Sequence, residues 1–277
     1  MFIEILKAAF YGIVQGITEW LPISSTGHMI LFEQLIPLDV SKSFWDMFLV
    51  VIQFGSILAV VLLYWNKLWP WSRTKNELER KKTYNLWGKV LVGVIPAAVI
   101  GLLFDDIITE YLYNYTTVAI TLIIYGVLFI VVENMNRVKH PTIRNLQKLD
   151  YKTALFIGAF QVLALIPGTS RSGATIIGAL LLGCSRYVAA EYSFFLAVPV
   201  MLGASGLKIV KYFVKTGVGF TGTETAILIT GMIVAFVVSI FAIKFLMGYI
   251  RNHNFKVFGY YRIILWIIIL IYAFVIR

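Results

Sequence analysis

Two short polar segments carry residue types that do chemistry, although apolar sequence surrounds both. The first extends from Gln15 to His28 and contains a carboxamide, a carboxylate, a run of hydroxyls and an imidazole. The second extends from Pro167 to Thr175, and its one ionisable group is Arg171. Carboxylate, hydroxyl and guanidinium groups are typical of phosphoryl transfer to water, where positioning and charge neutralisation do most of the work. We therefore predict that the two segments form one active site.

The first segment offers oxygen ligands for a cation. Gln15 and Glu19 are four residues apart, so on a helix they share one face, and Pro22 breaks the helix soon afterwards. A carboxylate beside a carboxamide suits a hard divalent cation such as Mg²⁺ or Ca²⁺. We predict Gln15 and Glu19 as metal ligands. The alternative is that Glu19 only hydrogen-bonds a neighbouring helix.

Three hydroxyl residues follow the break, where a second helix is expected to begin: Ser24, Ser25 and Thr26. The alternative for one of the three is that its hydroxyl only caps free backbone N–H groups at the helix start. His28 lies one turn beyond Ser25, and a hydroxyl within reach of an imidazole is the usual arrangement for an activated nucleophile. We predict Ser25 and His28 as catalytic and Ser24 and Thr26 as substrate-binding. Two nucleophiles remain as alternatives: the Ser25 hydroxyl and a metal-bound water.

The second segment supplies the positive charge that the first lacks. The guanidinium of Arg171 is planar, always charged and able to donate two parallel hydrogen bonds to a phosphate. Ser170, Ser172 and Thr175 add neutral donors, and the start of the following helix is itself an anion site. We predict a phosphate cradle with Arg171 as a catalytic residue and the three hydroxyls as substrate-binding. A structural pairing of Arg171 with Glu19 is the alternative, and the two roles are compatible.

The elements that position these segments are predicted to lie in a membrane. Hydrophobic residues make up 60% and charged residues 14% of the 277 residues, whereas soluble domains carry roughly 25% charged residues. Stretches 5–35 and 151–186 are apolar but broken at Pro22 and Pro167, so their pieces are too short to cross and we predict re-entrant hairpins. Six further apolar runs are long enough to span a bilayer. These spans are 44–65, 86–104, 115–133, 188–209, 225–247 and 257–276.

The net charge of +10 does not indicate a nucleic-acid partner, because the basic residues are distributed among the loops as the positive-inside rule predicts. Fifteen Lys and Arg residues lie in three connections that we place in the cytoplasm, against four in the three that we place outside. The cytoplasmic connections are 66–89, 134–152 and 248–262, and the outer ones are 36–43, 105–114 and 208–224. The first hairpin then enters from outside and the second from the cytoplasm.

The two halves of the chain are weakly similar when residue n is set against residue n+146. The matches are Ala8 with Ala154, Phe10 with Phe156, Gly12 with Gly158, Gln15 with Gln161, Ser24 with Ser170 and Gly27 with Gly173. Because three spans separate the hairpins, related halves would be inverted, as in many secondary transporters. We predict an all-α polytopic membrane protein with six transmembrane helices and two re-entrant helical hairpins in an inverted-topology repeat. The single membrane domain, 1–277, divides into repeats 1–135 and 150–277 with a cytoplasmic linker, 136–149.

Both polar segments resemble the motifs of a known family, the bacterial undecaprenyl-pyrophosphate phosphatases of the bacitracin-resistance type. Its motifs are Glu- or Gln-x-x-x-Glu followed by Pro-x-Ser-Ser-Thr-Gly-His, and Pro-Gly-x-Ser-Arg-Ser-x-x-Thr, and the resemblance covers essentially the whole chain. It implies Glu19, Ser25, His28 and Arg171 as central residues. Gln15 stands where many members have Glu, which puts in doubt any mechanism that needs two carboxylates there.

The resemblance also implies an activity and a location. The family removes the terminal phosphate from the C55 isoprenoid diphosphate, with divalent cations, at the outer face of the bacterial cytoplasmic membrane. The product is the monophosphate carrier lipid used for peptidoglycan, and the activity confers bacitracin resistance. The expected partner is thus a membrane lipid substrate, and a homo-oligomer is left open.

Two other classes of protein share some of these features. A polyprenyl-phosphate flippase or transporter fits inverted repeats and broken helices, and hydrolysis by purified protein in detergent would exclude it. The other large family of lipid phosphatases shares Ser-Gly-His and Ser-Arg pieces but needs an Arg-Pro pair preceded by Lys. No Arg-Pro dipeptide occurs in this chain, so that family is rejected.

Overall fold

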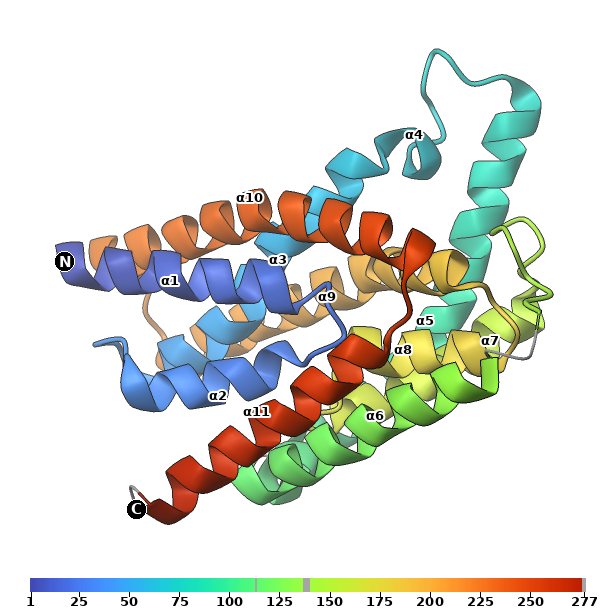
Figure 1. The fold of residues 1–277 in the computed structure, drawn as a ribbon. Coiled ribbons are helices and arrows are strands. Elements are labelled where there is room, and N and C mark those ends of the chain that lie inside the picture. The colour runs from blue at the N-terminus through green and yellow to red at the C-terminus, as the bar shows by residue number, and fades with distance from the viewer. Residues whose placement is uncertain (113, 137–139, 276–277) are drawn as a thin grey trace.

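The computed structural model describes residues 1–112, 114–136 and 140–275, and in these ranges every extended element of secondary structure is a helix (Figure 1). The first half contains α1 (Phe2–Thr18), α2 (Ser25–Leu35), α3 (Lys42–Leu63), α4 (Trp65–Leu68), α5 (Glu77–Leu112) and α6 (Tyr115–Asn136). The second half contains α7 (Tyr151–Val162), the short 3-10 helix η1 (Leu163–Leu165), α8 (Arg171–Leu181), α9 (Arg186–Thr216), α10 (Gly222–Asn252) and α11 (Lys256–Val275).

The predicted membrane spans coincide with the long helices. Over the described residues, five helices are long and apolar enough to cross a membrane: α3, α5, α6, α9 and α10. The sixth predicted span coincides with α11, although its last residue, 276, lies outside the described residues. The prediction of an all-α polytopic membrane protein is therefore confirmed.

Several helices extend beyond the apolar runs that predicted them. Helix α5 begins at Glu77, nine residues before the predicted span at 86. Asn76 and Glu79 explain this start, because the Glu79 N–H donates to Asn76 Oδ1 and the Asn76 N–H donates to Glu79 Oε2. This reciprocal capping stabilises a helical turn in polar surroundings. Hydropathy marks the part of a helix that lies in lipid, whereas backbone hydrogen bonding continues into the interface.

Both predicted hairpins are present as broken helices. The chain leaves α1 at Thr18 and begins α2 at Ser25, with Pro22 in the turn between them. In the second hairpin, α7 and η1 are followed by a turn that ends where α8 begins. Figure 1 shows the two hairpins entering from opposite ends of the bundle, with their turns close to its middle. The Ser172 hydroxyl donates to the Glu19 backbone carbonyl oxygen at 3.2 Å, so the turns are in direct contact.

Each hairpin packs against a long helix of the other half, and glycines allow the backbones to touch. A Cβ built at Gly12 of α1 would lie 2.7 Å from the carbonyl oxygen of Gly231 in α10. A Cβ built at Gly158 of α7 would overlap the carbonyl oxygen of Gly93 in α5. Neither position has room for a side chain. The halves are thus interlocked in a reciprocal manner, while the predicted repeat boundaries stay a prediction.

Candidate active site

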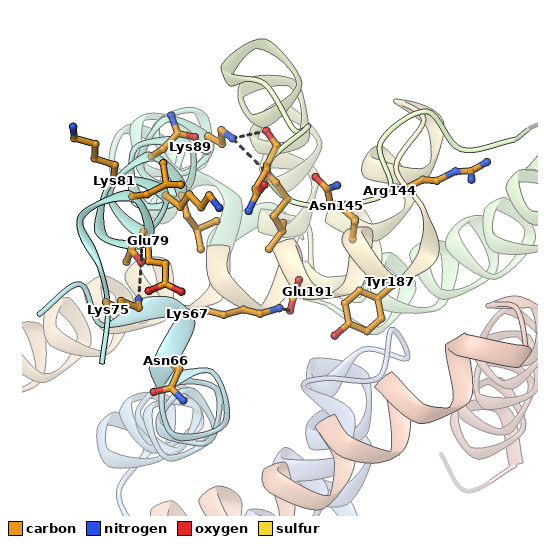
Figure 2. A pocket seen from close by; sticks show the side chains of 18 residues that line it. Asn66, Lys67, Lys75, Glu79, Lys81, Lys89, Arg144, Asn145, Tyr187 and Glu191 are labelled. Carbon is orange, nitrogen blue, oxygen red and sulfur yellow. Dashed lines mark hydrogen bonds and ion pairs between the residues drawn. The ribbon is translucent and has the colours of Figure 1, made fainter. Parts of the chain in front are cut away.

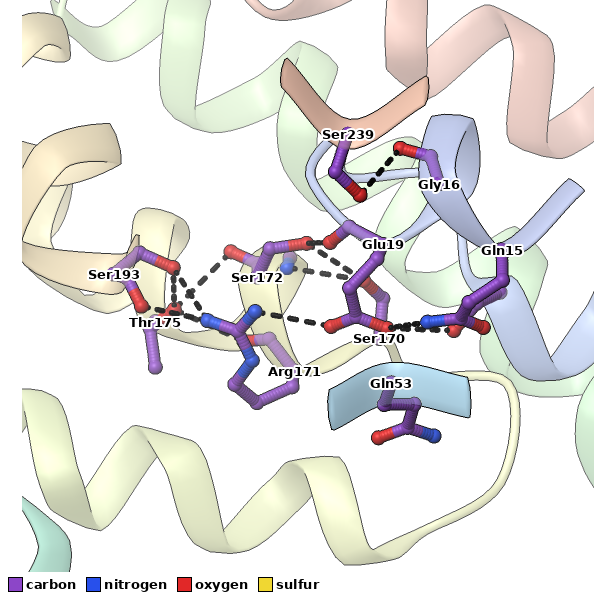
Figure 3. A network of polar contacts seen from close by, with 12 residues as sticks. Gln15, Gly16, Glu19, Gln53, Ser170, Arg171, Ser172, Thr175, Ser193 and Ser239 are labelled. Carbon is purple, nitrogen blue, oxygen red and sulfur yellow. Dashed lines mark hydrogen bonds and ion pairs between the residues drawn. The ribbon is translucent and has the colours of Figure 1, made fainter. Parts of the chain in front are cut away.

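Glu19 lies at the centre of a hydrogen-bond network that joins the two hairpins (Figure 3). Its side chain is 5% exposed, directly after the end of α1. Glu19 Oε2 accepts from Gln15 Nε2 at 2.9 Å and from Ser25 Oγ at 3.2 Å. Glu19 Oε1 accepts from Arg171 Nη2 at 3.0 Å. The structure therefore brings together four predicted site residues from two segments about 150 residues apart in the chain.

Arg171 is the first residue of α8, and its guanidinium is fixed from several sides. Nη1 donates to the Ser193 carbonyl oxygen at 2.6 Å and to its hydroxyl at 3.3 Å. The guanidinium carbon lies 5.6 Å from the centroid of the Trp20 ring, a distance typical of a cation–π contact. The buried Nε has no hydrogen-bond partner in the described part of the chain. Arg171 is held rigidly and retains one free donor.

The three hydroxyls predicted to bind substrate alongside Arg171 stabilise the turn and α8. Ser170 Oγ accepts from the Gly173 N–H at 3.2 Å and so caps α8. Ser172 Oγ lies 3.2 Å from Ser170 Oγ and, as described, also bonds the first hairpin. Thr175 Oγ1 lies 2.7 Å from the Ser193 hydroxyl. Their contacts with substrate stay predictions.

In the first segment, two further predicted site residues start α2. Ser24 Oγ accepts from the Gly27 N–H at 3.4 Å, which makes Ser24 the capping hydroxyl of the three. Thr26 follows in the first turn and is half-buried, and its side chain makes no hydrogen bond in the described ranges. A contact of Thr26 with substrate stays a prediction.

The predicted pairing of His28 with Ser25 is not what the structure contains. His28 Nδ1 lies 2.8 Å from the Ser24 carbonyl oxygen, and Nε2 lies 2.7 Å from the Tyr261 hydroxyl. Because a carbonyl only accepts, Nδ1 carries a proton, and a neutral ring then accepts from Tyr261 at Nε2. Both ring nitrogens are occupied, and the Ser25 hydroxyl donates to Glu19 instead. Glu19, not His28, is the base in contact with Ser25.

Arg262 of α11 is a functional candidate that the sequence analysis missed. It was counted in the connection 248–262, but the structure places it in α11 with no exposed surface. Its Nη2 donates to the carbonyl oxygens of Gly168 and Thr169, at 2.8 and 2.6 Å. Its Nε and Nη1 have no partner within the described residues. The available signal was a single arginine inside the last apolar run, and the charge asymmetry becomes fourteen against four.

The ligand set for a cation is small. Among the described residues, no group of three or more His, Cys, Asp and Glu side chains is placed to hold a metal ion. Glu19 is a carboxylate of the site, and the Gln15 amide presents its Nε2 to Glu19. Rotation of this amide by half a turn would bring its oxygen beside the carboxylate. One carboxylate and one amide oxygen fit a hard cation whose other ligands are phosphate oxygens and water. The metal site stays a prediction.

These features define a class of protein. Charged and hydroxyl side chains are buried where two broken helices meet inside a polytopic helical bundle, and such residues in a membrane protein mark a functional site. The family model described as bacitracin resistance protein BacA matches residues 8–268. The chain belongs to this family, which confirms the resemblance drawn from its motifs.

Relatives with high identity extend over nearly the whole chain. The chain is 62% identical over 275 residues to the undecaprenyl-diphosphatase of Acetivibrio thermocellus, covering 99% of this chain and 100% of the relative. It is 58% identical over 271 residues to the protein of the same name from Desulfitobacterium hafniense, covering 98% and 96%. It is also 58% identical over 273 residues to the undecaprenyl-diphosphatase of Enterococcus faecalis, covering 98% and 97%.

Proposed function

We propose that this chain hydrolyses the terminal phosphate of undecaprenyl diphosphate, giving undecaprenyl phosphate and inorganic phosphate. One observation carries the chemistry: Glu19 accepts hydrogen bonds from both Ser25 and Arg171 at the contact between the hairpins. The three relatives named undecaprenyl-diphosphatase, similar over nearly their full lengths, support the substrate. A site buried among membrane helices suits a substrate whose chain stays in the lipid.

The donors that we assign to the diphosphate have no hydrogen-bond partner among the described residues. Arg171 Nε and Arg262 Nε and Nη1 are buried and unpaired in the described residues. Arg262 Nη1 lies 3.1 Å from the position that a Cβ at Gly173 would take, next to the N-terminus of α8. Buried donors without partners are rare because they lose their hydration. A diphosphate beside Gly173 would pair with donors of this kind and would also meet the positive end of the helix dipole.

In the proposed reaction, Glu19 acts as general base. Its Oε2 takes the proton of Ser25 while Ser25 Oγ bonds to the terminal phosphorus. The bond from that phosphorus to the bridging oxygen breaks, and undecaprenyl phosphate leaves with the bridging oxygen. Water then attacks the phosphorus of the phosphoserine, and the bond from phosphorus to Ser25 Oγ breaks. Ser25 Oγ recovers its proton from Glu19, and the hydrogens of the water leave with inorganic phosphate. Arg171 stabilises the anionic form of Glu19 and the charge on the phosphate oxygens.

A second route uses the same residues. Glu19 would take the proton from a water molecule that attacks phosphorus directly, and Ser25 would donate a hydrogen bond to phosphate. We favour attack by Ser25, because its hydroxyl already donates to the carboxylate at 3.2 Å. His28 and Tyr261 form a hydrogen-bonded pair that connects α2 to α11, and we assign His28 the positioning of the Ser24–Ser25 turn.

The proposed cofactor is Mg²⁺ or Ca²⁺. Glu19 and the Gln15 amide oxygen would hold it, with Gln15 taking the place that a carboxylate has in many members of the family. When bound, such an ion neutralises negative charge on the phosphate oxygens.

The proposed location is the bacterial cytoplasmic membrane, with the site open to the outer side. The asymmetry of fourteen basic residues against four supports this orientation, because α1 and α2 then enter from the outer end. There the product returns to the pool of carrier lipid for cell-wall synthesis.

Phosphate release from C55 diphosphate by the purified protein in detergent, with and without chelator, tests the proposal. Detergent solutions have no two sides, so turnover there requires hydrolysis and not lipid transport. We expect release that falls on addition of chelator. Absence of release in the presence of added divalent cation would contradict the proposed function.

A further inference from the structure

A cavity of about 720 Å³ lies at the end of the molecule that carries the connections 64–76 and 140–150 (Figure 2). Its wall consists of α4, the first turns of α5, residues 144–147 and the first turns of α9. It is separate from the site around Glu19 and contains none of the motif residues. Two carboxylates line it, Glu79 and Glu191, together with six cationic side chains. The cations are Lys67, Lys75, Lys81, Lys82, Lys89 and Arg144.

Two of the cations are neutralised by ion pairs. Lys67 Nζ lies 2.5 Å from Oε1 of the buried Glu191. Lys81 Nζ lies 2.8 Å from Oε1 of Glu77 on the outer surface of α5. The second pair is exposed on both sides and contributes little to stability.

The other four cations form no ion pair in the ranges that the structure describes: Lys75, Lys82, Lys89 and Arg144. Their hydrogen bonds go to neutral oxygen atoms. Lys75 donates to the Trp69 carbonyl oxygen at 2.9 Å and to the Thr83 hydroxyl at 2.7 Å. Lys89 donates to the Leu146 carbonyl oxygen at 3.2 Å. The cavity therefore holds an excess of positive charge.

Glu79, the other carboxylate that lines the cavity, already accepts a hydrogen bond at the start of α5. Glu79 accepts the Asn76 N–H in the capping of α5. Burial lowers the pKa of Lys75, even though the charge of Glu79 acts in the opposite direction. An anion in the cavity would offset that loss of hydration.

Tryptophans fix the depth of the cavity relative to a membrane. Trp65, Trp69 and Trp71 are exposed by 45%, 38% and 59%, and their rings contact one another in sequence. Exposed tryptophans of membrane proteins lie at the level of the lipid headgroups. Lys67 lies between them in the chain, and the exposed Leu78 gives the cavity an apolar side. The mouth of the cavity is thus at headgroup depth, with apolar surface beside it.

We propose that this cavity binds the phosphate group of an anionic phospholipid, such as phosphatidylglycerol. The excess of cations selects a negative headgroup, and a basic pocket beside membrane helices is the arrangement that such headgroups occupy. The tryptophans favour a lipid over a soluble anion, because they hold the cavity at the membrane surface. The hydrolytic site and this lipid site lie in different parts of the bundle, so binding here does not depend on the proposed reaction.

The experiment compares lipid binding by two double variants in a neutral detergent. Lys75→Gln/Lys82→Gln removes two unpaired charges from the cavity. Lys208→Gln/Lys215→Gln removes two charges near the opposite end of α9, and serves as the matched control. Short-chain phosphatidylglycerol is titrated into each protein beside phosphatidylcholine of the same chain length, and bound lipid is counted by native mass spectrometry.

We expect wild type to bind phosphatidylglycerol in preference to phosphatidylcholine. Each basic residue at an anionic lipid contributes on the order of fivefold in affinity, so the cavity variant should bind about 25-fold more weakly, and the control as wild type. Equal loss in both double variants, or equal affinity for both lipids, would overturn the proposal. Displacement by millimolar inorganic phosphate would assign the cavity to a soluble anion instead.

Hydrolysis of C55 diphosphate in detergent shows whether the variants are folded, and we expect wild-type rates for both. If the cavity variant is inactive, Lys82→Gln alone repeats the comparison, because Lys82 makes no hydrogen bond or ion pair with any described residue. That variant should bind phosphatidylglycerol about fivefold more weakly. An affinity equal to that of wild type would overturn the proposal.

Discussion

Ser24 and Ser170 both have a positive φ, of 72° and 70°, with ψ of 95° and 125°. Each precedes the returning helix of its hairpin, and each hydroxyl accepts the N–H of a glycine three residues further on. A positive φ is unfavourable for residues other than glycine because of steric clashes with Cβ. Such conformations persist where the surroundings over-determine them, and they concentrate at functional sites. The two halves therefore use one geometry to turn the chain at the point where the site is built.

The cap at Ser170 can be separated from its backbone strain by two substitutions. Ser170→Ala removes the cap and keeps the strain, so we expect destabilisation by about 1 kcal/mol. Ser170→Gly removes the cap but relieves the left-handed conformation, so its stability should be close to that of wild type. Thermal unfolding in detergent measures both. A glycine variant less stable than the alanine variant would show that strain does not matter here.

Arg171→Lys should lose most activity although the charge is kept. A lysine ammonium cannot bond Glu19 and Ser193 and also donate to phosphate in the plane that the guanidinium provides. We expect kcat to fall by about 10²–10³-fold, as for loss of one positioned donor. Arg251→Lys, the same exchange at an exposed arginine, is the control. Near wild-type turnover of Arg171→Lys would remove Arg171 from the phosphate cradle.

Glu19→Gln keeps the shape of the side chain and removes its charge. As general base, Glu19 should contribute about 10²–10⁴-fold to the rate. As a metal ligand, it should also set the cation concentration needed for half-maximal activity. Titration of Mg²⁺ against the residual rate measures the second effect, with Glu77→Gln as a control on the exposed surface. A lower rate with unchanged metal dependence would leave Glu19 as the base alone.

The attacking oxygen can be identified by acid trapping. If Ser25 attacks, quenching after mixing with terminally radiolabelled diphosphate should leave label on the peptide that contains Ser25, and none in Ser25→Ala. Two displacements at phosphorus also predict retention with a chiral thiophosphate substrate. Inversion, together with the absence of trapped label, would assign the attack to water.

The orientation of the bundle is testable with single cysteines in a Cys184→Ala background. Cysteines at Asn76 and Asn145 should react only from the cytoplasm, and one at Asn114 only from outside. The three positions are exposed, so labelling reports sidedness and not burial. Reaction of the Asn114 and Asn145 positions from the same side would contradict the predicted topology.

Breaks in apolar runs made the hairpins predictable from sequence. Proline and glycine interrupt helices for local steric reasons, so Pro22 and Pro167 were sufficient to locate both turns. That the two segments form one site was predicted from their complementary chemistry, and the pairing of Arg171 with Glu19 was the alternative to a phosphate cradle. These inferences rest on local chemistry and on the membrane environment of the helices. Both can be judged from a single sequence.

Contacts between distant helices were beyond the sequence. Ser193, Tyr261 and Arg262 reach the site from α9 and α11. No local pattern marks Ser193 or Tyr261, and the position of Arg262 inside an apolar run does not reveal its partners. The prediction that His28 pairs with Ser25 was wrong for the same reason. Spacing along α2 does not reveal that α11 places the Tyr261 hydroxyl beside the imidazole ring. Arg262 was misplaced because an arginine near the end of an apolar run is ordinarily an interfacial residue.

The interlocked glycine contacts also set an order of events during synthesis. The backbone surface around Gly12 is covered by α10 around Gly231, more than 200 residues later in the chain. The first hairpin therefore has to wait in the membrane, without its main packing partner, until most of the protein has been inserted. Folding of the catalytic turn then becomes one of the last steps of biogenesis, and a truncated chain that ends before α10 contains Glu19, Ser25 and Arg171 without an assembled site.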